Sequence, residues 1–215
     1  MMEIIDISPL ISPRIAVFPG DTPFFQEYLL EIDKGAHLDL STIRTTTHLG
    51  AHCDAPSHYD ADGTGIASRS LDYYVGPCQI MHVSVPRGAR IRPADLTEDI
   101  LAPRLLFYTG SFPDPDHFNL DFNALSPELI HYASDRGVRL IGLDTPSVDP
   151  ADSKKLESHR VIAEKDMAIL EGVVLSHVDP GLYTLIALPL KIEGADASPV
   201  RAVLLSASNL NTGRL

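Results

Sequence analysis

Short runs of apolar and β-branched residues recur along the chain, and glycine or proline bounds most of them. This pattern is typical of modest strands separated by turns. Eight runs predict strands, at residues 3–8, 41–48, 77–85, 104–110, 138–145, 171–178, 182–192 and 200–207. In the second run, STIRTTTH, alternate side chains share a side of the strand, and one side carries Thr42, Arg44, Thr46 and His48. We expect this polar side to face a functional site.

Helical periodicity is clearest in two segments. Residues 126–137 predict a helix with Ser126 as its N-cap, and residues 153–166 predict a second helix. A weaker third helix is expected at 93–101. No repeat or linker divides the chain, so we expect one domain over residues 1–215. Strands outnumber helices, which favours an α/β fold with a mixed sheet or barrel-like β core and peripheral helices.

Composition excludes several classes of partner. The 215 residues carry 29 acidic and 17 basic side chains, a formal net charge of −12, and no cluster of lysine and arginine suits a nucleic acid. No apolar run approaches the roughly 20 residues of a membrane-spanning helix. The N-terminal segment lacks the basic start and unbroken apolar stretch of a signal peptide, so we expect a cytoplasmic protein. Cys53 and Cys78 form no CxxC pair and are expected to be reduced and buried.

Three histidines and two aspartates lie within thirteen residues, HLGAHCDAPSHYD, at positions 48–60. Metal ligands must converge on a point about 2 Å from each donor atom. Fully extended backbone would place the Cα atoms of His48 and His52 roughly 13 Å apart, too far to share one ion. In a continuous helix, Asp54 would point about 200° away from His52. Neither regular structure brings the three side chains together.

A turn at Gly50 would allow these side chains to converge, because glycine tolerates turn backbone that other residues avoid. If an extended segment follows the turn, His52 and Asp54 share one side and Cys53 faces the other. Pro56 prevents a helix from forming across the segment. The glycine and the proline therefore lie where a metal site on this segment would need them.

His58, four residues beyond Asp54, is either a fourth ligand or an unligated acid–base group beside the metal. The nitrogen and oxygen donors favour an open catalytic site over the closed, often thiolate-rich shell of structural zinc. Structural zinc and chance crowding of polar residues stay open as alternatives. The segment DADGTG at 60–65 lacks most calcium-loop ligands and predicts a turn. The remaining isolated histidines are expected to be ordinary surface or core residues: His37, His82, His117, His131 and His177.

The stretch HLGAHCDAPSHYDADG resembles the HxGxHxDxPxH signature of the metal-dependent cyclase-like hydrolases. The flanking segments narrow this resemblance to the bacterial kynurenine formamidase (arylformamidase) family. They are DISPLISPRIAVFPGDTPF, LDYYVGPCQIMHV, LIGLDTPSVDPADSKKLESHR, MAILEGVVL and LIALPLKIEGADASPVRAVL. The similarity runs from about Ile4 to Leu205 in the same order and spacing. The first motif alone indicates only the superfamily, whereas the combination is specific.

The resemblance implies a swivelling β/β/α-type fold with a barrel-like mixed β core, assembled as a homodimer. It also implies two zinc ions per subunit, with manganese as an alternative. Carried over by position, His48, His52 and Asp54 would hold one ion, and Asp54 would bridge to a second held also by His159 and Glu171. These last two residues lie twelve positions apart, about 18 Å along a continuous helix. The helix must therefore end near residues 165–166, and the chain must double back.

Without the resemblance, His159 reads as a surface residue of a helix and Glu171 as an acid at a strand edge. The resemblance further assigns proton transfer to His58. It implies hydrolysis of N-formyl-L-kynurenine to L-kynurenine and formate, a step of tryptophan degradation, by a hydroxide generated at the two ions. No GxSxG motif supports a serine hydrolase.

Phe18 departs from the family pattern, which commonly has tryptophan immediately before Pro-Gly-Asp, where it contacts the substrate. Phenylalanine keeps an aromatic face but loses area and the indole N–H. By itself, Phe18 between apolar residues and prolines reads as core packing. The substitution keeps a second activity open, hydrolysis of a lactam such as isatin by another member of the same superfamily. A metal-binding protein without turnover is the alternative outside the enzymes.

Overall fold

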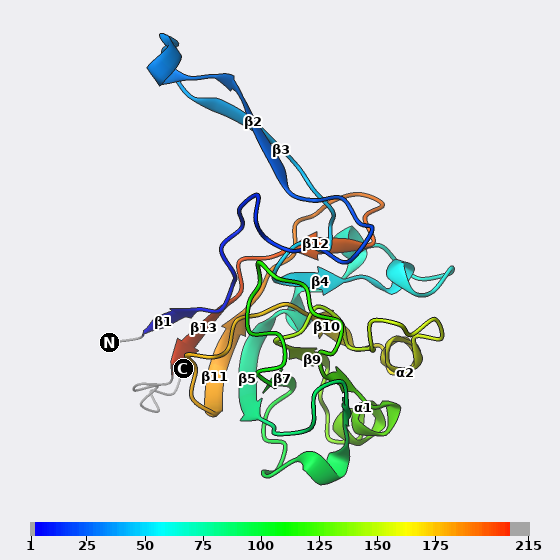
Figure 1. Cartoon of the computed structure of the whole chain (residues 1–215). Helices are drawn as coiled ribbons and strands as arrows, with labels where there is room; N and C mark the ends of the chain where they lie inside the picture. Colours follow the sequence, from blue (N-terminus) through cyan, green and yellow to red (C-terminus); the bar gives the residue numbers. More distant parts are fainter. Residues whose placement is uncertain (1–2, 207–215) are drawn as a thin grey trace, which may run out of the picture.

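The computed structural model describes residues 3–206 (Figure 1). Its centre is a seven-stranded mixed sheet in the order β1-β13-β11-β5-β7-β9-β10. Strands β5, β7, β9 and β10 run parallel, while β11 is antiparallel to β5 and β13 is antiparallel to β11 and β1. The sheet is open, with β1 and β10 at its edges. The strands are β1 Ile4–Asp6, β5 Val75–His82, β7 Arg104–Tyr108, β9 Leu140–Leu143, β10 Ala168–Leu170, β11 Gly181–Ile186 and β13 Val203–Ser206.

Three two-stranded sheets accompany the large one. Strand β4 (His52–Asp54) pairs with β12 (Ala197–Pro199), β2 (Phe25–Leu30) pairs with β3 (Leu40–Arg44), and β6 (Arg90–Ile91) pairs with β8 (Ala124–Leu125). The β2–β3 hairpin projects away from the body of the molecule (Figure 1).

The helices are few and short. They are α1 (Pro127–Ser134), α2 (Glu157–Glu164) and 3₁₀ helices at Ile32–Lys34, Pro56–His58, Ile66–Ser68, Leu71–Tyr73 and Pro93–Asp95. Within residues 3–206, no helix has the length and apolar character needed to cross a membrane.

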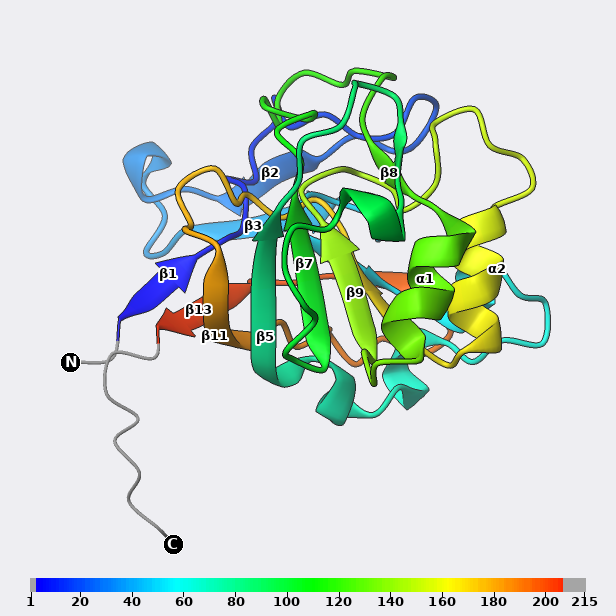
Figure 2. The same cartoon turned by 90° about the horizontal axis from the view of Figure 1, so that it is seen from below.

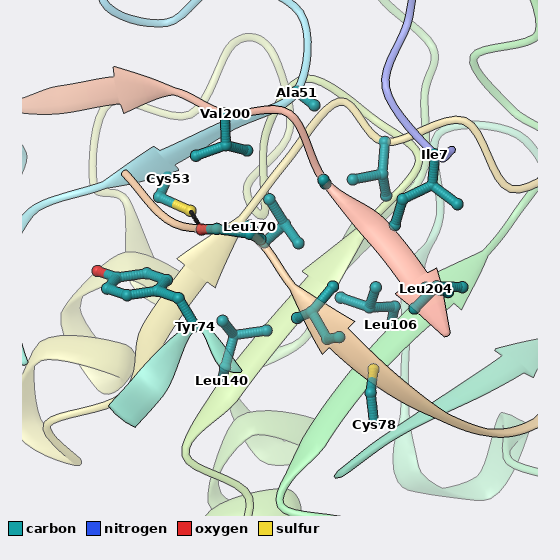
Figure 3. Packing of buried hydrophobic residues seen from close by; sticks show 14 of the residues in the cluster. Ile7, Ala51, Cys53, Tyr74, Cys78, Leu106, Leu140, Leu170, Val200 and Leu204 are labelled. Carbon is teal, nitrogen blue, oxygen red and sulfur yellow. Dashed lines mark hydrogen bonds between the residues drawn. The ribbon is translucent and has the colours of Figure 1, made fainter. Parts of the chain in front are cut away.

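Alternation along the central strands divides the core into two layers. Leu106 packs on one side of the sheet with Cys53 and Ala51 from the β4 segment (Figure 3). Its neighbour Phe107 packs on the other side with Ile130 of α1 and other apolar residues. Figure 2 shows α1 and α2 together beside the β9 end of the sheet. The layers are therefore β4 and β12, then the large sheet, then the helices, which confirms the predicted α/β fold with a mixed sheet and peripheral helices.

Six predicted strands are confirmed, as β1, β5, β7, β9, β11 and β13; all six end earlier than predicted, and β5 and β11 also begin one or two residues earlier. Position 207 of the last predicted strand lies outside the described residues. The strand predicted at 41–48 was too long: β3 ends at Arg44, and His48 lies beyond it. Both faces of β3 are exposed, so the expected polar, site-facing side was wrong.

The strand predicted at 171–178 was also wrong, because the strand there, β10, ends at Leu170. Gly172 has φ +67°, a left-handed conformation that interrupts an extended strand. The apolar residues Val173, Leu175 and Val178 are nevertheless buried in the core. Their hydrophobicity reflects packing of an irregular segment rather than pairing in a sheet.

The predicted helices differ from the observed helices mainly in length. Ser126 caps α1 as expected, since its side chain accepts a hydrogen bond from the Leu129 amide. The predicted second helix begins only at Glu157, because Leu156 has φ +49°. The helix predicted at 93–101 is wrong: only one 3₁₀ turn, Pro93–Asp95, forms there.

Candidate metal centre and pocket

Strand β4 forms the floor of the candidate site, and its geometry follows the expected turn and extended segment. Gly50 has φ +56°, and residues 52–54 are extended. Cys53 points into the core with no exposed surface. His52 and Asp54 are also buried, with only 2% of their surface exposed. Ala55 is extended, because the ring of the following Pro56 disfavours helical backbone there, and a 3₁₀ turn follows it.

Glu171 reaches the site through backbone pairing with β4. The His52 amide donates to the Glu171 carbonyl at 3.1 Å, and the Glu171 amide donates back to the His52 carbonyl at 2.9 Å. The chain reverses between α2 and β10 at Asp166, which has φ +48°. The doubling back required to bring Glu171 near α2 is therefore present.

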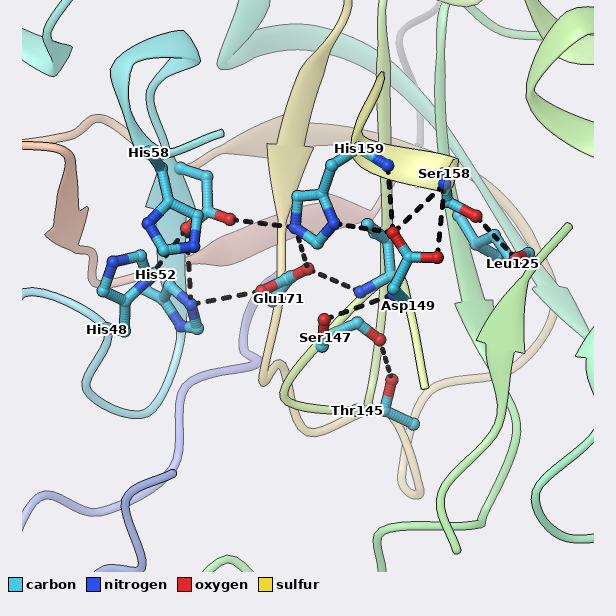
Figure 4. A network of polar contacts seen from close by, with 12 residues as sticks. His48, His52, His58, Leu125, Thr145, Ser147, Asp149, Ser158, His159 and Glu171 are labelled. Carbon is cyan, nitrogen blue, oxygen red and sulfur yellow. Dashed lines mark hydrogen bonds and ion pairs between the residues drawn. The ribbon is translucent and has the colours of Figure 1, made fainter. Parts of the chain in front are cut away.

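Asp54 lies at the centre of the side-chain cluster, because its carboxylate is within 3.6 Å of three histidines, and these histidines and Glu171 are labelled in Figure 4. Its Oδ1 is 3.0 Å from His48 Nδ1 and 3.6 Å from His52 Nε2, and its Oδ2 is 3.6 Å from His159 Nε2. Glu171 Oε2 lies 3.3 Å from His52 Nε2, and Glu171 Oε1 lies 4.0 Å from His159 Nε2. The structure thus brings together the five residues expected to bind metal.

Three atoms at this centre are buried without a well-formed hydrogen bond among residues 3–206: His52 Nε2 and both carboxylate oxygens of Asp54, which have imidazole nitrogens only as ion-pair neighbours at 3.0–3.6 Å. Burying polar and charged groups without partners is costly. Two compact groups of metal-ligating side chains share Asp54, one with His48 and His58 and the other with His52 and Glu171. Within each group the ligating atoms lie within 4.8 Å of one another. Divalent cations between these donors would satisfy the unpartnered atoms, so the residues fit a metal centre.

The two groups differ from the sequence expectation, because His52 groups with Glu171 rather than with His48, and His159 belongs to neither group. The resemblance grouped His48 with His52 and left His58 unligated, whereas here His58 lies near His48 and Asp54. Both roles left open for His58, ligand and acid–base group, are compatible with this position.

Hydrogen bonds behind the cluster fix the ring of His159. Its Nδ1 lies 2.8 Å from Asp149 Oδ2, which leaves Nε2 toward Asp54. Asp149 is fully buried and pairs with Arg90 at 2.8 Å. A carboxylate on the outer nitrogen of a metal-binding histidine holds the ring and its tautomer. His159 itself is buried on α2, so the interpretation as a surface helix residue was wrong.

The carboxylates and imidazoles shift one another's pKa. Burial opposes the charged form of His48, but its pairs with Asp54 and Asp196 outweigh burial and raise its pKa to about 9. Burial also opposes the charged form of His159, yet the hydrogen bond to Asp149 and the nearby Asp54 carboxylate raise its pKa to about 10. Burial alone would raise the pKa of Asp54, but its histidine partners hold it well below the usual value. The Asp54 carboxylate is therefore ionised, the state in which it can bind a cation.

A cavity of about 260 Å³ opens beside the cluster, slightly smaller than common ligand pockets of about 300–1,000 Å³. Its lining consists of Phe18, Asp21, His48, Asp54, His58, Pro146, Ser147, Pro150, Ala151, Ser153, Leu156, His159 and Glu171. Phe18 is 39% exposed and packs edge-on against Phe118, with 5.3 Å between ring centroids. It therefore borders the pocket rather than the core, contrary to the interpretation of Phe18 from its neighbours alone.

Sequence reasoning missed Asp149 and Asp196, which contact His159 and His48 respectively. Each lies within one of the segments that carry the family resemblance, which is the only signal that pointed to them. Residues predicted to be ordinary lie elsewhere: His82 and His177 bond backbone carbonyls, and Cys53 and Cys78 are buried free thiols.

This arrangement belongs to a known class of proteins. Residues 5–150 match the Cyclase family, "Putative cyclase", and the chain belongs to this family. It is also similar to the kynurenine formamidase of Bordetella petrii, with 45% identity over 206 residues that cover 95% of this chain and 98% of that protein. The family resemblance drawn from the sequence is therefore confirmed.

Solved structures share the fold. A "potential metal-dependent hydrolase with cyclase activity" has 25% identity and a TM-score of 0.84, covering 97% of this chain and 100% of its own. Isatin hydrolase A from Labrenzia aggregata has 20% identity and a TM-score of 0.78, covering 95% of this chain and 93% of its own.

Proposed function

We propose that this protein is a metal-dependent arylformamidase that hydrolyses N-formyl-L-kynurenine to L-kynurenine and formate in tryptophan degradation. The observation that carries the proposal is the buried cluster around Asp54, beside a pocket bordered by an aromatic ring. Within the described part of the chain the Asp54 carboxylate oxygens make no well-formed hydrogen bond and have only imidazole nitrogens as ion-pair neighbours. The 45% identity to a kynurenine formamidase supports the choice of substrate.

We assign two divalent cations to the cluster, held by His48, His52, Asp54, His159 and Glu171. Zinc is the proposed metal because nitrogen and carboxylate donors suit it, and manganese is the alternative. When bound, such cations lower the pKa of water toward neutrality and polarise a carbonyl oxygen.

The chain's own groups would bind the substrate and move its proton. Phe18 offers an aromatic face to the aryl ring of the substrate at one side of the pocket. His58 also lines the pocket, and its side chain is 33% exposed. Arylamines are weakly basic, so the departing nitrogen needs a proton as the C–N bond breaks, and His58 would accept a proton from the attacking water and pass it to that nitrogen.

The test is to measure metal content and turnover of formylkynurenine on the same protein sample. We expect about two metal ions per chain, loss of turnover after chelation, and recovery when zinc is added. In His58→Ala the metal should stay and turnover should fall by about 10²–10⁴-fold. His131→Ala, on α1 outside the cluster, serves as the matched control. Protein that holds metal but hydrolyses no N-formyl arylamine would refute the enzyme and leave a metal-binding protein.

A second activity, hydrolysis of a lactam such as isatin, is favoured by one observation, the phenylalanine at position 18. The shared fold with isatin hydrolases is compatible with it. Assaying formylkynurenine and isatin side by side separates the two activities. Faster turnover of isatin would assign the protein to lactam hydrolysis instead.

We further propose that the protein is a cytoplasmic homodimer joined through the β2–β3 hairpin. Seven large apolar side chains of the hairpin are 39% to 73% exposed: Phe25, Tyr28, Leu29, Ile32, Leu38, Leu40 and Ile43. At on the order of 100 Å² for each half-exposed side chain, the hairpin presents roughly 700 Å². This area is close to the ~800 Å² that each partner buries in a standard interface.

A further inference from the structure

Asp196 reaches the metal centre through the pairing of β12 with β4. In this pairing Ala197 lies opposite Asp54. The ladder continues one step further, because the Ala55 amide donates to the Asp196 carbonyl at 2.8 Å. The backbone of Asp196 is therefore held by the same strand that carries Asp54, although the two residues are far apart in the sequence.

The Asp196 carboxylate contacts three neighbouring side chains. Its Oδ2 lies 3.1 Å from His48 Nε2 and 3.3 Å from His58 Nδ1. Its Oδ1 accepts a hydrogen bond from the Thr47 hydroxyl at 2.9 Å. The two imidazole rings lie together, with 4.2 Å between their centroids and 47° between their planes. A single carboxylate oxygen thus faces one nitrogen of each ring.

These contacts indicate which ring nitrogen of His48 faces the metal centre and which ring nitrogen of His58 can exchange a proton. His48 turns Nδ1 toward Asp54 and Nε2 toward Asp196, so the nitrogen facing the centre is Nδ1. For His58, Nδ1 faces Asp196, which leaves Nε2 to exchange a proton. Hydrogen bonding at one ring nitrogen selects the tautomer at the other. Both histidines line the cavity, whereas Asp196 does not. Asp196 therefore influences the cavity by orienting the rings of His48 and His58.

We propose that Asp196 is a positioning residue that holds His58 in its Nδ1–H tautomer and orients the ring of His48 at the same time. Asp196 thereby links His48, a proposed metal ligand, to His58, the proposed proton-transfer group. The effect on turnover rests on the proposed formamidase function, whereas the effect on the tautomer does not.

The first experiment observes the tautomer directly. Long-range ¹H–¹⁵N spectra of histidine-labelled, metal-free protein at about pH 8, above the ordinary histidine pKa, report which nitrogen carries the proton. The signals of His58 are assigned by their absence in His58→Ala. We expect the Nδ1–H form in the unmodified protein and a shift toward Nε2–H in Asp196→Ala. An unchanged tautomer in that variant would overturn the proposal.

The second experiment uses turnover of formylkynurenine by the zinc-loaded protein. Asp196→Asn should lower kcat by about 10–100-fold, the usual effect of losing an outer partner of this kind, with KM changed less than about twofold. Asp196→Glu should recover part of kcat because it keeps the charge. Glu193→Gln, an exposed acid on the same loop, is the matched control and should behave like the unmodified protein.

The outcomes distinguish the positioning role of Asp196 from the proposed formamidase activity. If kcat of Asp196→Asn stays within about twofold of the unmodified protein, the positioning role is refuted. If formylkynurenine is not hydrolysed at all while the tautomer still depends on Asp196, the proposed function fails and the positioning role stands. Should Asp196→Ala fail to fold, the tautomer is measured in Asp196→Leu, whose side chain is similar in size but accepts no hydrogen bond, and an unshifted signal there refutes the role equally.

Discussion

Gly172 follows Glu171 directly and packs against the turn between His48 and His52, the histidines proposed to bind metal. Its φ of +67° is a left-handed conformation, and a Cβ atom there would lie 2.2 Å from the carbonyl oxygen of Gly50. That carbonyl also bonds His52 Nδ1 at 2.9 Å. Replacing Gly172 with alanine should therefore displace the turn between His48 and His52 as well as strain its own backbone.

The magnitude has two parts that a matched variant separates. The left-handed conformation costs about 1–2 kcal/mol for a residue with a Cβ. Overpacking against the Gly50 backbone adds about 1–3 kcal/mol. Gly137 has φ +80°, and among the described residues no atom would lie within 4 Å of a Cβ added there, so Gly137→Ala should show only the first cost. We expect Gly172→Ala to lose roughly 2–5 kcal/mol of unfolding free energy.

Urea unfolding of both variants in the presence of a chelator measures this difference without the contribution of bound metal. Zinc titration of the refolded proteins should then show weaker binding only for Gly172→Ala, because only that substitution displaces Gly50. Equal destabilisation of the two variants, together with unchanged zinc binding, would refute the argument that contact between Gly172 and Gly50 shapes the centre.

Three further predictions concern other parts of the molecule. Asp149→Asn should weaken zinc binding about 10–100-fold in a chelator competition, because the outer nitrogen of His159 loses its charged acceptor, and unchanged affinity would contradict this. Ile43→Lys, on the exposed hairpin, should convert the dimer to a monomer in light scattering, whereas a persistent dimer would exclude the hairpin as the interface. Arg69 holds the pKa of Asp166 below its ordinary value, so this ion pair stabilises the fold above the ordinary aspartate pKa and is lost as the pH falls through the lowered one. Asp166→Asn should therefore cost up to about 1 kcal/mol at neutral pH and progressively less as the pH falls through the lowered pKa, and a cost independent of pH would argue against the pair.

The position of β3 on the projecting hairpin explains why one prediction from the sequence was wrong. The alternation in STIRTTTH was interpreted as a strand facing a functional site, but β3 lies on the projecting hairpin with both faces exposed. Alternation shows that a strand has two different sides without showing what covers either of them. The length error has a similar cause, since nothing in the local pattern shows that the strand ends at Arg44.

Local chemistry in the sequence did determine the segment around His52. A glycine that permits a turn, a short extended run and a proline beyond it left few ways for His48, His52 and Asp54 to converge. The six confirmed strands likewise follow from apolar runs bounded by turn residues, because these preferences act over a few neighbouring residues.

Only the tertiary structure decided how distant segments complete the site. Glu171 meets His52 through a bridge between segments more than one hundred residues apart, and Asp196 reaches His48 and His58 through the pairing of β12 with β4. Asp149, on another loop, holds the ring of His159 through a hydrogen bond with Nδ1. A histidine on the exposed face of a helix would lack such a partner. Such contacts depend on strand register and on how layers pack. These properties arise from the whole core rather than from the periodicity of any one segment.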